Sequence, residues 1–329
     1  MADALRWGIL GAANFAAEHM APAIHAARGN RLAALASSSD AKAERFRAIN
    51  DQITVFDDYD ALLASDAIDA VYIPLPNHLH VDWTLKAVAA GKHVLCEKPI
   101  ALEAGEIDAL IAARDESGLV VAEAFMIVHH PQWQRAKALL AEGAVGTLGH
   151  ADVAFSFHNA NMDNIRNKPE TGGGGIRDIG VYAYGSVRYA TGAEPLTLAA
   201  RVRTENGVDT WAQADGVMEG PLGRFTYCAM TSTRLAPRQH VTFHGDGATL
   251  TLTSPFNAGL FGEAQIVLRA ADGTVTRERF PAVNHYVLQV ENFAASVRDG
   301  AAYPMPLEMS RGTQAMMDMV FASASDISW

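Results

Sequence analysis

Cysteine, positive charge and long hydrophobic runs are all scarce in this sequence. Cys96 and Cys228 are its two cysteines, too few for a disulfide framework and typical of a reducing cytosol. The net charge of −11 argues against a nucleic-acid partner, although one bound phosphate needs only a local site. No window approaches the roughly 18 uncharged apolar residues of a membrane span, and no signal peptide is recognisable. We therefore expect a cytoplasmic protein with neither a nucleic-acid nor a membrane partner.

The composition that is present, 49% hydrophobic and 19% charged over 329 residues, suffices for two domains with sizeable cores. Short apolar segments and helical segments alternate up to residue 124, which predicts an α/β fold with a doubly wound parallel sheet. The expected strands are 5–10, 31–36, 53–56, 70–73, 93–96 and 119–123. We expect a dinucleotide-binding domain over 1–124 and a substrate-binding and dimerisation domain over 125–329.

The first expected strand runs into a turn of small residues and then into a helix, which is the context of a dinucleotide fingerprint. Gly11 permits the turn, and the start of the helix would face a pyrophosphate with its partial positive charge. Ala13 and Ala16 stand where the fingerprint has its second and third glycines. The turn therefore fits a bound dinucleotide and an ordinary strand–helix connection equally well.

The end of the second expected strand bears on which dinucleotide is bound. NAD-binding proteins place a carboxylate there for the ribose hydroxyls. Here Ser37, Ser38 and Ser39 follow the strand, with Asp40 and Lys42 beyond them. Three hydroxyls and a lysine suit a 2′-phosphate, which favours NADP. Asp40 either caps the next helix or serves the ribose, so NAD stays the alternative.

The fifth expected strand is apolar, includes Cys96 as core filler, and ends in Glu97-Lys98-Pro99. An apolar sheet cannot hold both charges without partners. The carboxyl ends of parallel strands border the ligand crevice, so Lys98 is a candidate to handle a proton or a polarised oxygen. The alternative is a solvated strand end, in which Glu97 only holds the lysine in place. His80, in the first turn of the preceding helix, either faces the same crevice or is structural.

Asn77-x-x-His80, together with the run 89–99, resembles the signature of the glucose–fructose oxidoreductase / inositol dehydrogenase family, Gfo/Idh/MocA. The resemblance covers essentially the whole chain. It implies that Lys98 contacts both the nicotinamide ribose and the substrate. The residues expected to contact the cofactor are Gly11, Ala12, Ala13, Asn14, Phe15, Ser37, Ser38, Lys42, Leu75, Asn77, His80, Glu97 and Lys98.

From Gly149 onward the hydrophobic period switches to two, and turn residues join the apolar segments. The expected strands are 151–157, 197–204, 213–218, 224–231, 239–243, 248–253, 265–270 and 274–280. Successive hairpins predict a large, mostly antiparallel open sheet, followed by helices at 286–298 and 309–325. In the family that the chain resembles, this sheet commonly pairs with a second subunit, which implies a homodimer or a higher homo-oligomer.

One helix among these strands carries the second group of candidates. A glycine run, 172–175, permits a close approach of backbone to ligand and precedes Asp178 and Tyr182. The two residues are four apart and share a helix face, as an acid/base pair would; the alternative is a capped helix with a half-buried tyrosine. Many family members have His in place of Tyr182. Asp-x-Gly-x-Tyr resembles the branch of glucose–fructose oxidoreductase, dimeric dihydrodiol dehydrogenases and several aldose dehydrogenases.

The resemblance to that branch implies that Tyr182 exchanges the proton at the reacting oxygen and that Asp178 orients the sugar. A Lys98 cation beside the phenol would lower its pKa from the usual value of about 10. Residues 127–131, Ile-Val-His-His-Pro, lack a Tyr and an Arg of relatives, which predicts a different substrate pocket. The polar loop 159–166 either binds sugar hydroxyls or is solvated. The residues expected to contact substrate are His129, Asn161, Arg166, Asp178 and Tyr182.

Together these patterns predict an NADP-dependent oxidoreductase that oxidises C1 of an aldose to a lactone, or runs the reverse carbonyl reduction. One alternative is a glucose–fructose-type enzyme that holds NADP tightly, oxidises one sugar and reduces another. A second alternative is a dinucleotide-binding regulator without activity, against which the joint presence of Lys98, Asp178 and Tyr182 argues. No cluster of residues has metal-ligand spacing, so no metal is expected.

Overall fold

The computed structural model describes residues 4–327, which form two compact units. Unit 1 contains the chain up to His129 and also Asn284–Arg311, whereas unit 2 contains His130–Val283 and the chain from Gly312 onward. This division differs from a single cut after residue 124, because a late segment returns to the first unit. The returning helix α8 (His285–Asp299) packs against α1 (Ala21–Ala26), which explains why the segment belongs there.

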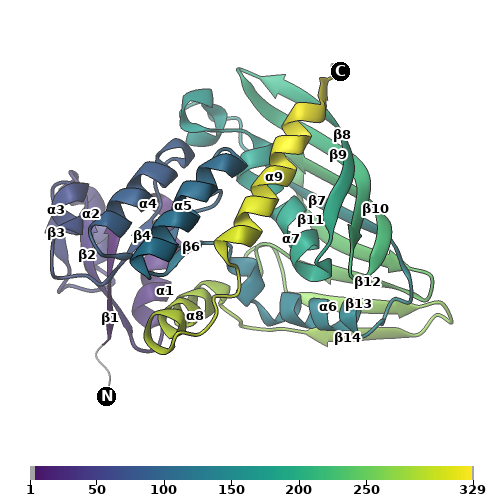
Figure 1. Ribbon diagram of the computed structural model, residues 1–329, viewed down its shortest axis with the longest axis horizontal. Helices are drawn as coiled ribbons and strands as arrows, with labels where there is room; N and C mark the ends of the chain where they lie inside the picture. Colours follow the sequence, from purple (N-terminus) through teal and green to yellow (C-terminus); the bar gives the residue numbers. More distant parts are fainter. Residues whose placement is uncertain (1–3, 328–329) are drawn as a thin grey trace. The chain divides into compact units, whose positions relative to one another are not determined.

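Unit 1 is built around a sheet of six strands in the order β3-β2-β1-β4-β5-β6 (Figure 1). All neighbouring strands are parallel, which confirms the predicted doubly wound sheet. The strands are β1 (Leu5–Leu10), β2 (Asn30–Ala36), β3 (Thr54–Phe56), β4 (Ala70–Ile73), β5 (His93–Cys96) and β6 (Val121–Glu123). Every residue of β4 is buried, and Cys96 is fully buried in the core as predicted.

The helices of unit 1 up to α5 connect successive strands, whereas η3 and α8 do not, and Figure 1 shows α4 and α5 packed side by side. They are η1 (Ala16–Met20), α1, α2 (Asp40–Arg47), α3 (Tyr59–Leu63), η2 (Asn77–Leu79), α4 (His80–Ala89), α5 (Ala104–Ser117), η3 (Met126–His129) and α8. A capping box fixes the start of α5, because the side chains of Glu103 and Glu106 each accept from the other's backbone N–H.

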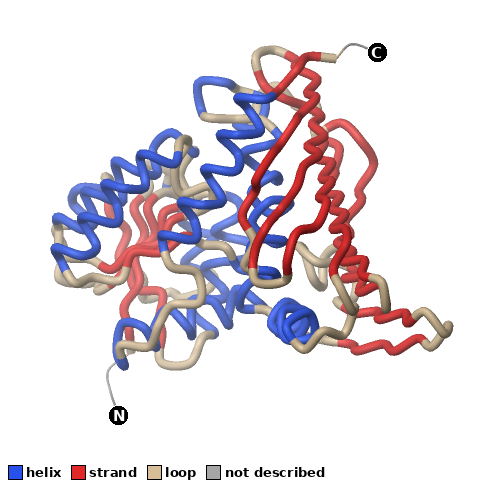
Figure 2. Tube along the Cα trace, turned by 45° about the vertical axis from the view of Figure 1, so that its right-hand side comes forward, coloured by secondary structure: helices blue, strands red, loops and turns tan. Residues whose placement is uncertain are grey.

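Unit 2 contains a sheet of nine strands in the order β14-β13-β12-β11-β7-β10-β9-β8-β15. Figure 2 draws the strands in red. The strands are β7 (Leu148–His158), β8 (Glu194–Glu205), β9 (Val208–Gly220), β10 (Gly223–Ser232), β11 (Arg234–Gly245), β12 (Ala248–Thr253), β13 (Gln265–Ala270), β14 (Val275–Arg279) and β15 (Ala324–Asp326). Its pairs are antiparallel except β7–β10 and β8–β15, so the predicted mostly antiparallel sheet is confirmed. The predicted last helix, 309–325, was placed two residues too late, because α9 (Leu307–Ser323) ends before β15.

Helices α6 (Pro131–Ala141) and α7 (Val181–Thr191) pack on this sheet and on each other. Helix α6 contacts β12 and β13, and α7 contacts β7 and β10. Every residue of α7 is buried, which is the pattern of a helix enclosed on all sides. The side chains at the start of α7 are therefore held by packing. No helix within residues 4–327 is long and apolar enough to cross a bilayer.

Candidate active site

The turn after β5 is built around Glu97 and Lys98, both of which are half-buried. Tyr72 of β4 donates its hydroxyl to Oε1 of Glu97 at 2.5 Å, and the backbone N–H of Lys98 donates to Oε2 at 3.2 Å. Burial raises the pKa of Tyr72, and the Glu97 carboxylate raises it further, so the phenol stays protonated. Glu97 thus fixes the backbone of Lys98, as the strand-end interpretation expects, while its placement against a cofactor stays a prediction.

His80 and Glu123 hold the next two residues of the same turn. The ring nitrogens of His80 lie 2.7 Å from the carbonyl oxygens of Leu75 and Pro99, and burial lowers its pKa to about 4. Oε1 of Glu123, at the end of β6, accepts from the backbone N–H of Ile100 at 2.9 Å. His80 therefore ties the end of β4 to the turn after β5, which favours its structural alternative over a direct contact with the crevice.

The turn after β1 has the geometry that a dinucleotide requires. Gly11 has φ of +93°, and its N–H donates to the carbonyl of Ala36 at 3.0 Å. A Cβ at this position would lie 3.1 Å from the hydroxyl oxygen of Tyr59 and 3.3 Å from a methyl carbon of Leu75, so only glycine fits without strain. The small side chains of Ala12 and Ala13 follow Gly11. The next element, η1, is a single π-helical turn, a rare feature that often marks functional sites. These residues fit a bound pyrophosphate.

The end of β2 differs from the sequence-based expectation in one respect. The residue that caps α2 is Ser39, whose Oγ accepts from the N–H of Lys42 at 3.4 Å. Asp40 is instead the first helical residue and pairs with Arg47 at 2.8 Å. The expectation that Asp40 caps this helix was therefore wrong, because the serine one residue earlier has the extended backbone of a cap.

Arg45 is a cation near this turn that sequence analysis missed. From α2 it donates to Oδ1 of Asn14 at 2.6 Å and pairs with Glu18 at 3.1 Å. It therefore lies beside the turn after β1, next to residues expected to contact the cofactor. Its spacing of three from Lys42 places both cations on neighbouring positions of one helix face, and that pattern was present in the sequence.

In unit 2, Asp178 and Tyr182 lie on two consecutive helical elements, η6 (Ile176–Gly180) and α7. Both are buried, with exposed fractions of 9% and 6%. Arg166 donates Nε to Oδ2 of Asp178 at 2.7 Å. The ring of Tyr182 lies 5.7 Å from those of Phe155 and Phe256. A charged partner therefore orients the carboxylate, and aromatic packing orients the phenol.

The asparagines of the polar loop mainly shape the loop itself. The side-chain oxygen of Asn159 accepts from the N–H of Asn161, that of Asn161 from Asp163, and that of Asn164 from Arg166, at 3.0–3.1 Å. Such Asx turns use a side-chain oxygen to hold the backbone two residues on. Arg166 is the residue of this loop that reaches Asp178, and Asn161 stays a predicted substrate contact that faces solvent.

His129 and the glycine run have structural roles that differ from those expected. Nδ1 of His129 lies 2.8 Å from the amide nitrogen of Asn292, Nε2 lies 3.1 Å from the hydroxyl of Tyr303, and the ring is 2% exposed. Burial lowers its pKa to about 3, so the ring is neutral and both nitrogens are used inside unit 1. At Gly173 a Cβ would lie 2.6 Å from the carbonyl oxygen of Arg166. The glycines thus allow the chain to approach itself, whereas a ligand was expected there.

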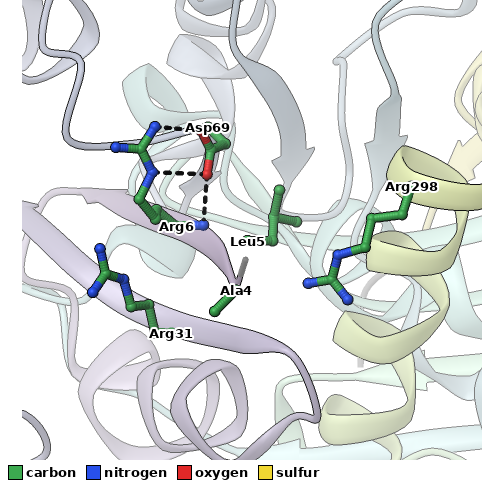
Figure 3. A pocket seen from close by; sticks show the side chains of 6 residues that line it. All are labelled: Ala4, Leu5, Arg6, Arg31, Asp69 and Arg298. Atoms are coloured by element: carbon green, nitrogen blue, oxygen red, sulfur yellow. Dashed lines mark hydrogen bonds and ion pairs between the residues drawn. The ribbon is translucent and has the colours of Figure 1, made fainter. Parts of the chain in front are cut away.

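A pocket of about 580 Å³ in unit 1 lies away from these residues (Figure 3). It is lined by Ala4, Leu5, Arg6, Arg31, Asp69 and Arg298. Arg6 and Arg31 lie near the amino ends of β1 and β2, opposite to the edge that carries Gly11 and Lys98. Asp69 is paired with Arg6, as the dashed lines in Figure 3 show. Within residues 4–327, no group of His, Cys, Asp and Glu is arranged to hold a metal ion.

Comparison with known proteins places this arrangement in a family. Residues 5–125 match the oxidoreductase family GFO/IDH/MocA, described as an NAD-binding Rossmann fold, and residues 133–251 match the C-terminal domain of that family. The chain is 37% identical to an uncharacterized oxidoreductase of Rhizobium meliloti over 99% of both chains. It is 34% identical to D-xylose 1-dehydrogenase (NADP(+)) 2 of Haloferax volcanii over 97% of both.

Among solved structures, a 3-ketoreductase from Actinomadura kijaniata in complex with NADP and TDP-benzene matches with a TM-score of 0.89 at 27% identity. The match covers 99% of this chain and 100% of that one. Both halves of the chain therefore match the same two-domain enzymes along nearly their full length. The chain belongs to the GFO/IDH/MocA oxidoreductase family, and its first unit is the NAD-binding Rossmann domain of an enzyme.

Proposed function

We propose that the protein is an NADP-dependent sugar oxidoreductase that oxidises C1 of an aldose to a lactone, or catalyses the reverse reduction. The observation that carries the proposal is the presence, in one chain, of Lys98 on a fixed turn and of Asp178 and Tyr182 as buried residues at a helix start. The xylose dehydrogenase that the chain resembles supports both the substrate class and NADP as cofactor.

NADP, when bound, supplies a two-electron acceptor for the hydride that leaves C1. Gly11, Asn14 and the helix start at η1 would hold its pyrophosphate, and Ser37, Lys42 and the newly identified Arg45 would hold its 2′-phosphate. NADP is favoured over NAD because Asp40, the first carboxylate that follows β2 in the sequence, is engaged by Arg47.

The proton path rests on the chain's own residues. Tyr182, as the phenolate, accepts the proton of the C1 hydroxyl and becomes the phenol, while the hydride leaves C1 with the C–H electron pair. Lys98 holds the reacting oxygen and stabilises the charge that develops on it. Asp178, oriented by Arg166, accepts hydrogen bonds from neighbouring sugar hydroxyls. In the reverse direction Tyr182 returns the proton to the carbonyl oxygen.

A second candidate function is the reduction of a ketone on a nucleotide-linked sugar. The match to a 3-ketoreductase in complex with NADP and TDP-benzene favours it. The same Lys98 and Tyr182 would serve, with the proton moving from the phenol to the ketone oxygen. A glucose–fructose-type cycle differs from both candidates in that purified protein would carry a bound nicotinamide absorbance band.

The deciding experiment is a panel of aldoses, polyols and a TDP-linked keto sugar, each with NADP or NAD in the oxidised or reduced form, with nicotinamide absorbance as readout. The proposal predicts reduction of NADP by at least one aldose, and a higher kcat/KM with NADP than with NAD. Turnover of the TDP-sugar alone would move the assignment to the second candidate. Turnover that favours NAD would contradict the argument from the end of β2.

We propose further that two copies associate through the nine-stranded sheet. Half of the residues of strand β8 are exposed, and Leu196 among them is 46% exposed, as expected of a face that a partner covers. Sedimentation analysis tests this proposal: a dimer is expected, and Leu196→Lys should shift it toward monomer. A wild-type monomer at micromolar concentration would contradict it.

A further inference from the structure

Asp209 is a buried carboxylate that the mechanism above does not use. It lies near the start of β9 and is 7% exposed. Its Oδ2 accepts a hydrogen bond from the backbone N–H of Ile176, the first residue of η6, at 2.7 Å. Burial raises the pKa of Asp209 to about 6, although the N–H groups of Ile176 and Gly175 and the charge of Arg177 lower it. A buried charge costs free energy unless it is paired and hydrogen-bonded, so the groups around Asp209 need an explanation.

The glycine run is shaped to receive this carboxylate. Gly174 has φ of +114°, and a Cβ there would overlap Oδ1 of Asp209. A Cβ at Gly175 would lie 3.2 Å from Oδ2. Residues 174 and 175 therefore need glycine because Asp209 occupies the space that a side chain would fill. The carboxylate also lies at the positive end of the helix that follows.

The same segment is hydrogen-bonded to both members of the Arg166–Asp178 pair. The N–H of Gly174 donates to the carbonyl of Arg166 at 2.9 Å, and the N–H of Asp178 donates to the carbonyl of Gly174 at 3.1 Å. Arg166 then closes the ring through its side chain on Asp178 at 2.7 Å. A displacement of Gly174 would therefore move the backbone on both sides of this ion pair.

We propose that Asp209 is a positioning residue whose ionised carboxylate holds residues 174–176, and through them Asp178 and Tyr182, in the orientation that catalysis needs. The inference rests on the proposed function of those two side chains. Protonation of Asp209 leaves one oxygen as a good acceptor for the N–H groups of Gly175 and Ile176, so the segment loosens. The ionisable groups that face Asp209 are Arg177 from η6 and Tyr184 from α7, whose pKa Asp209 helps to raise.

Asp209→Asn tests the proposal, with Asp215→Asn as the matched control on the same strand, where the side chain of Asp215 is 48% exposed. Asp209→Asn should lower kcat by about ten-fold or more, because small misplacements of catalytic groups are costly. It should leave the KM for NADP unchanged and abolish the decline of kcat below about pH 6 that the proposal predicts for wild type. Asp215→Asn should behave as wild type. A wild-type kcat and pH profile for Asp209→Asn would overturn the proposal.

A measurement without substrate separates this proposal from the proposed function. In wild-type protein, the backbone ¹⁵N shifts of Gly175 and Ile176 should titrate together with an apparent pKa of about 6. The titration is expected even if no sugar is turned over, and it needs no variant to fold. Amide shifts that stay constant between pH 5 and pH 7 would overturn the role of Asp209 (a window of about one unit on either side).

Discussion

The turn after β5 in unit 1 and the segment from η6 to the start of α7 in unit 2 each place candidate catalytic side chains, and each does so through a buried carboxylate. In each, a buried carboxylate accepts a backbone N–H close to a candidate catalytic side chain: Glu123 accepts from Ile100, and Asp209 accepts from Ile176. Burial raises the pKa of both carboxylates. In both units, therefore, hydrogen bonds to the backbone help to position the candidate catalytic side chains.

The two regions differ in how completely the carboxylate is used. Both oxygens of Asp209 lie against the glycine run, whereas Oε2 of Glu123 is buried and makes no hydrogen bond of normal length and angle among the described residues, although the nearby Ser310 side chain lowers the pKa of Glu123. Lys98 supplies a nearby positive charge that lowers the pKa of Glu123 somewhat. The buried charge of Glu123 beside Lys98 is therefore expected to lower the stability of the fold. The carboxylate of Asp209 is instead packed tightly against the glycine run.

The largest effect is expected at Lys98. Lys98→Met should lower turnover by about 10³-fold or more, because the variant loses the cation that stabilises the reacting oxygen. The fold should persist, since the hydrogen bond that Glu97 accepts comes from the backbone N–H of Lys98, which the substitution keeps. Steady-state kinetics and circular dichroism check both parts, with the exposed Lys86→Met as control. Unchanged turnover with every active sugar would remove Lys98 from the mechanism.

Removal of the phenol is expected to cost less than removal of the lysine. Tyr182→Phe keeps the ring between Phe155 and Phe256 and deletes only the hydroxyl, so kcat should fall by about 10²-fold without loss of stability. Tyr189→Phe, on the same helix, is the matched control. If the two variants show the same kcat, Tyr182 does not exchange the proton.

A smaller effect is expected at Arg166, whose side chain donates to Asp178 in the unit 2 region. Arg166→Lys keeps the charge but loses the Nε–H donor to Asp178, so the KM for the sugar should rise by about ten-fold while the KM for NADP stays constant. Arg166→Gln should raise the KM for the sugar further. A rise in the KM for NADP instead would assign Arg166 to the cofactor.

The smallest effect, and one of opposite sign, is expected at Glu123. Because its folded-state pKa lies above its unfolded value, ionised Glu123 destabilises the fold as pH rises. Glu123→Gln should therefore stabilise the protein at neutral pH by about 1 kcal/mol, a gain that fades as pH falls and the wild-type carboxyl protonates. Thermal unfolding measured across pH tests this, with exposed Glu116→Gln as control. A less stable Glu123→Gln at neutral pH would show that the carboxylate is not a cost.

Most of the fold could be predicted from sequence because the signals are local. The period-two pattern located the eight strands β7 to β14, and strand–helix alternation located β1 to β6. Contacts between segments that lie far apart in the sequence could not be predicted in this way. The packing of α8 on α1 and the capping of α2 by Ser39 in place of Asp40 depend on contacts and backbone angles that composition does not encode.

In the candidate site, too, local motifs were predicted and contacts from distant residues were not. Glu97-Lys98-Pro99 and Asp178–Tyr182 were found because each motif lies within a few residues of chain. Asp209 was missed because it contacts Ile176 from 33 residues away and stands alone in the sequence. His129 stays a predicted substrate contact, but a histidine among aromatics did not reveal that Asn292 and Tyr303 engage both of its nitrogens.

The central claim of the proposed function is that Lys98 and Tyr182 act on the same reacting oxygen. A double-mutant cycle on kcat, with Lys98→Met, Tyr182→Phe and the combined variant, tests it most directly. If the pair acts as a unit, the combined variant should lose no more than about the larger of the two single losses, as groups that share one step behave. If the two losses multiply instead, the residues act independently, and the account of a shared proton path is contradicted.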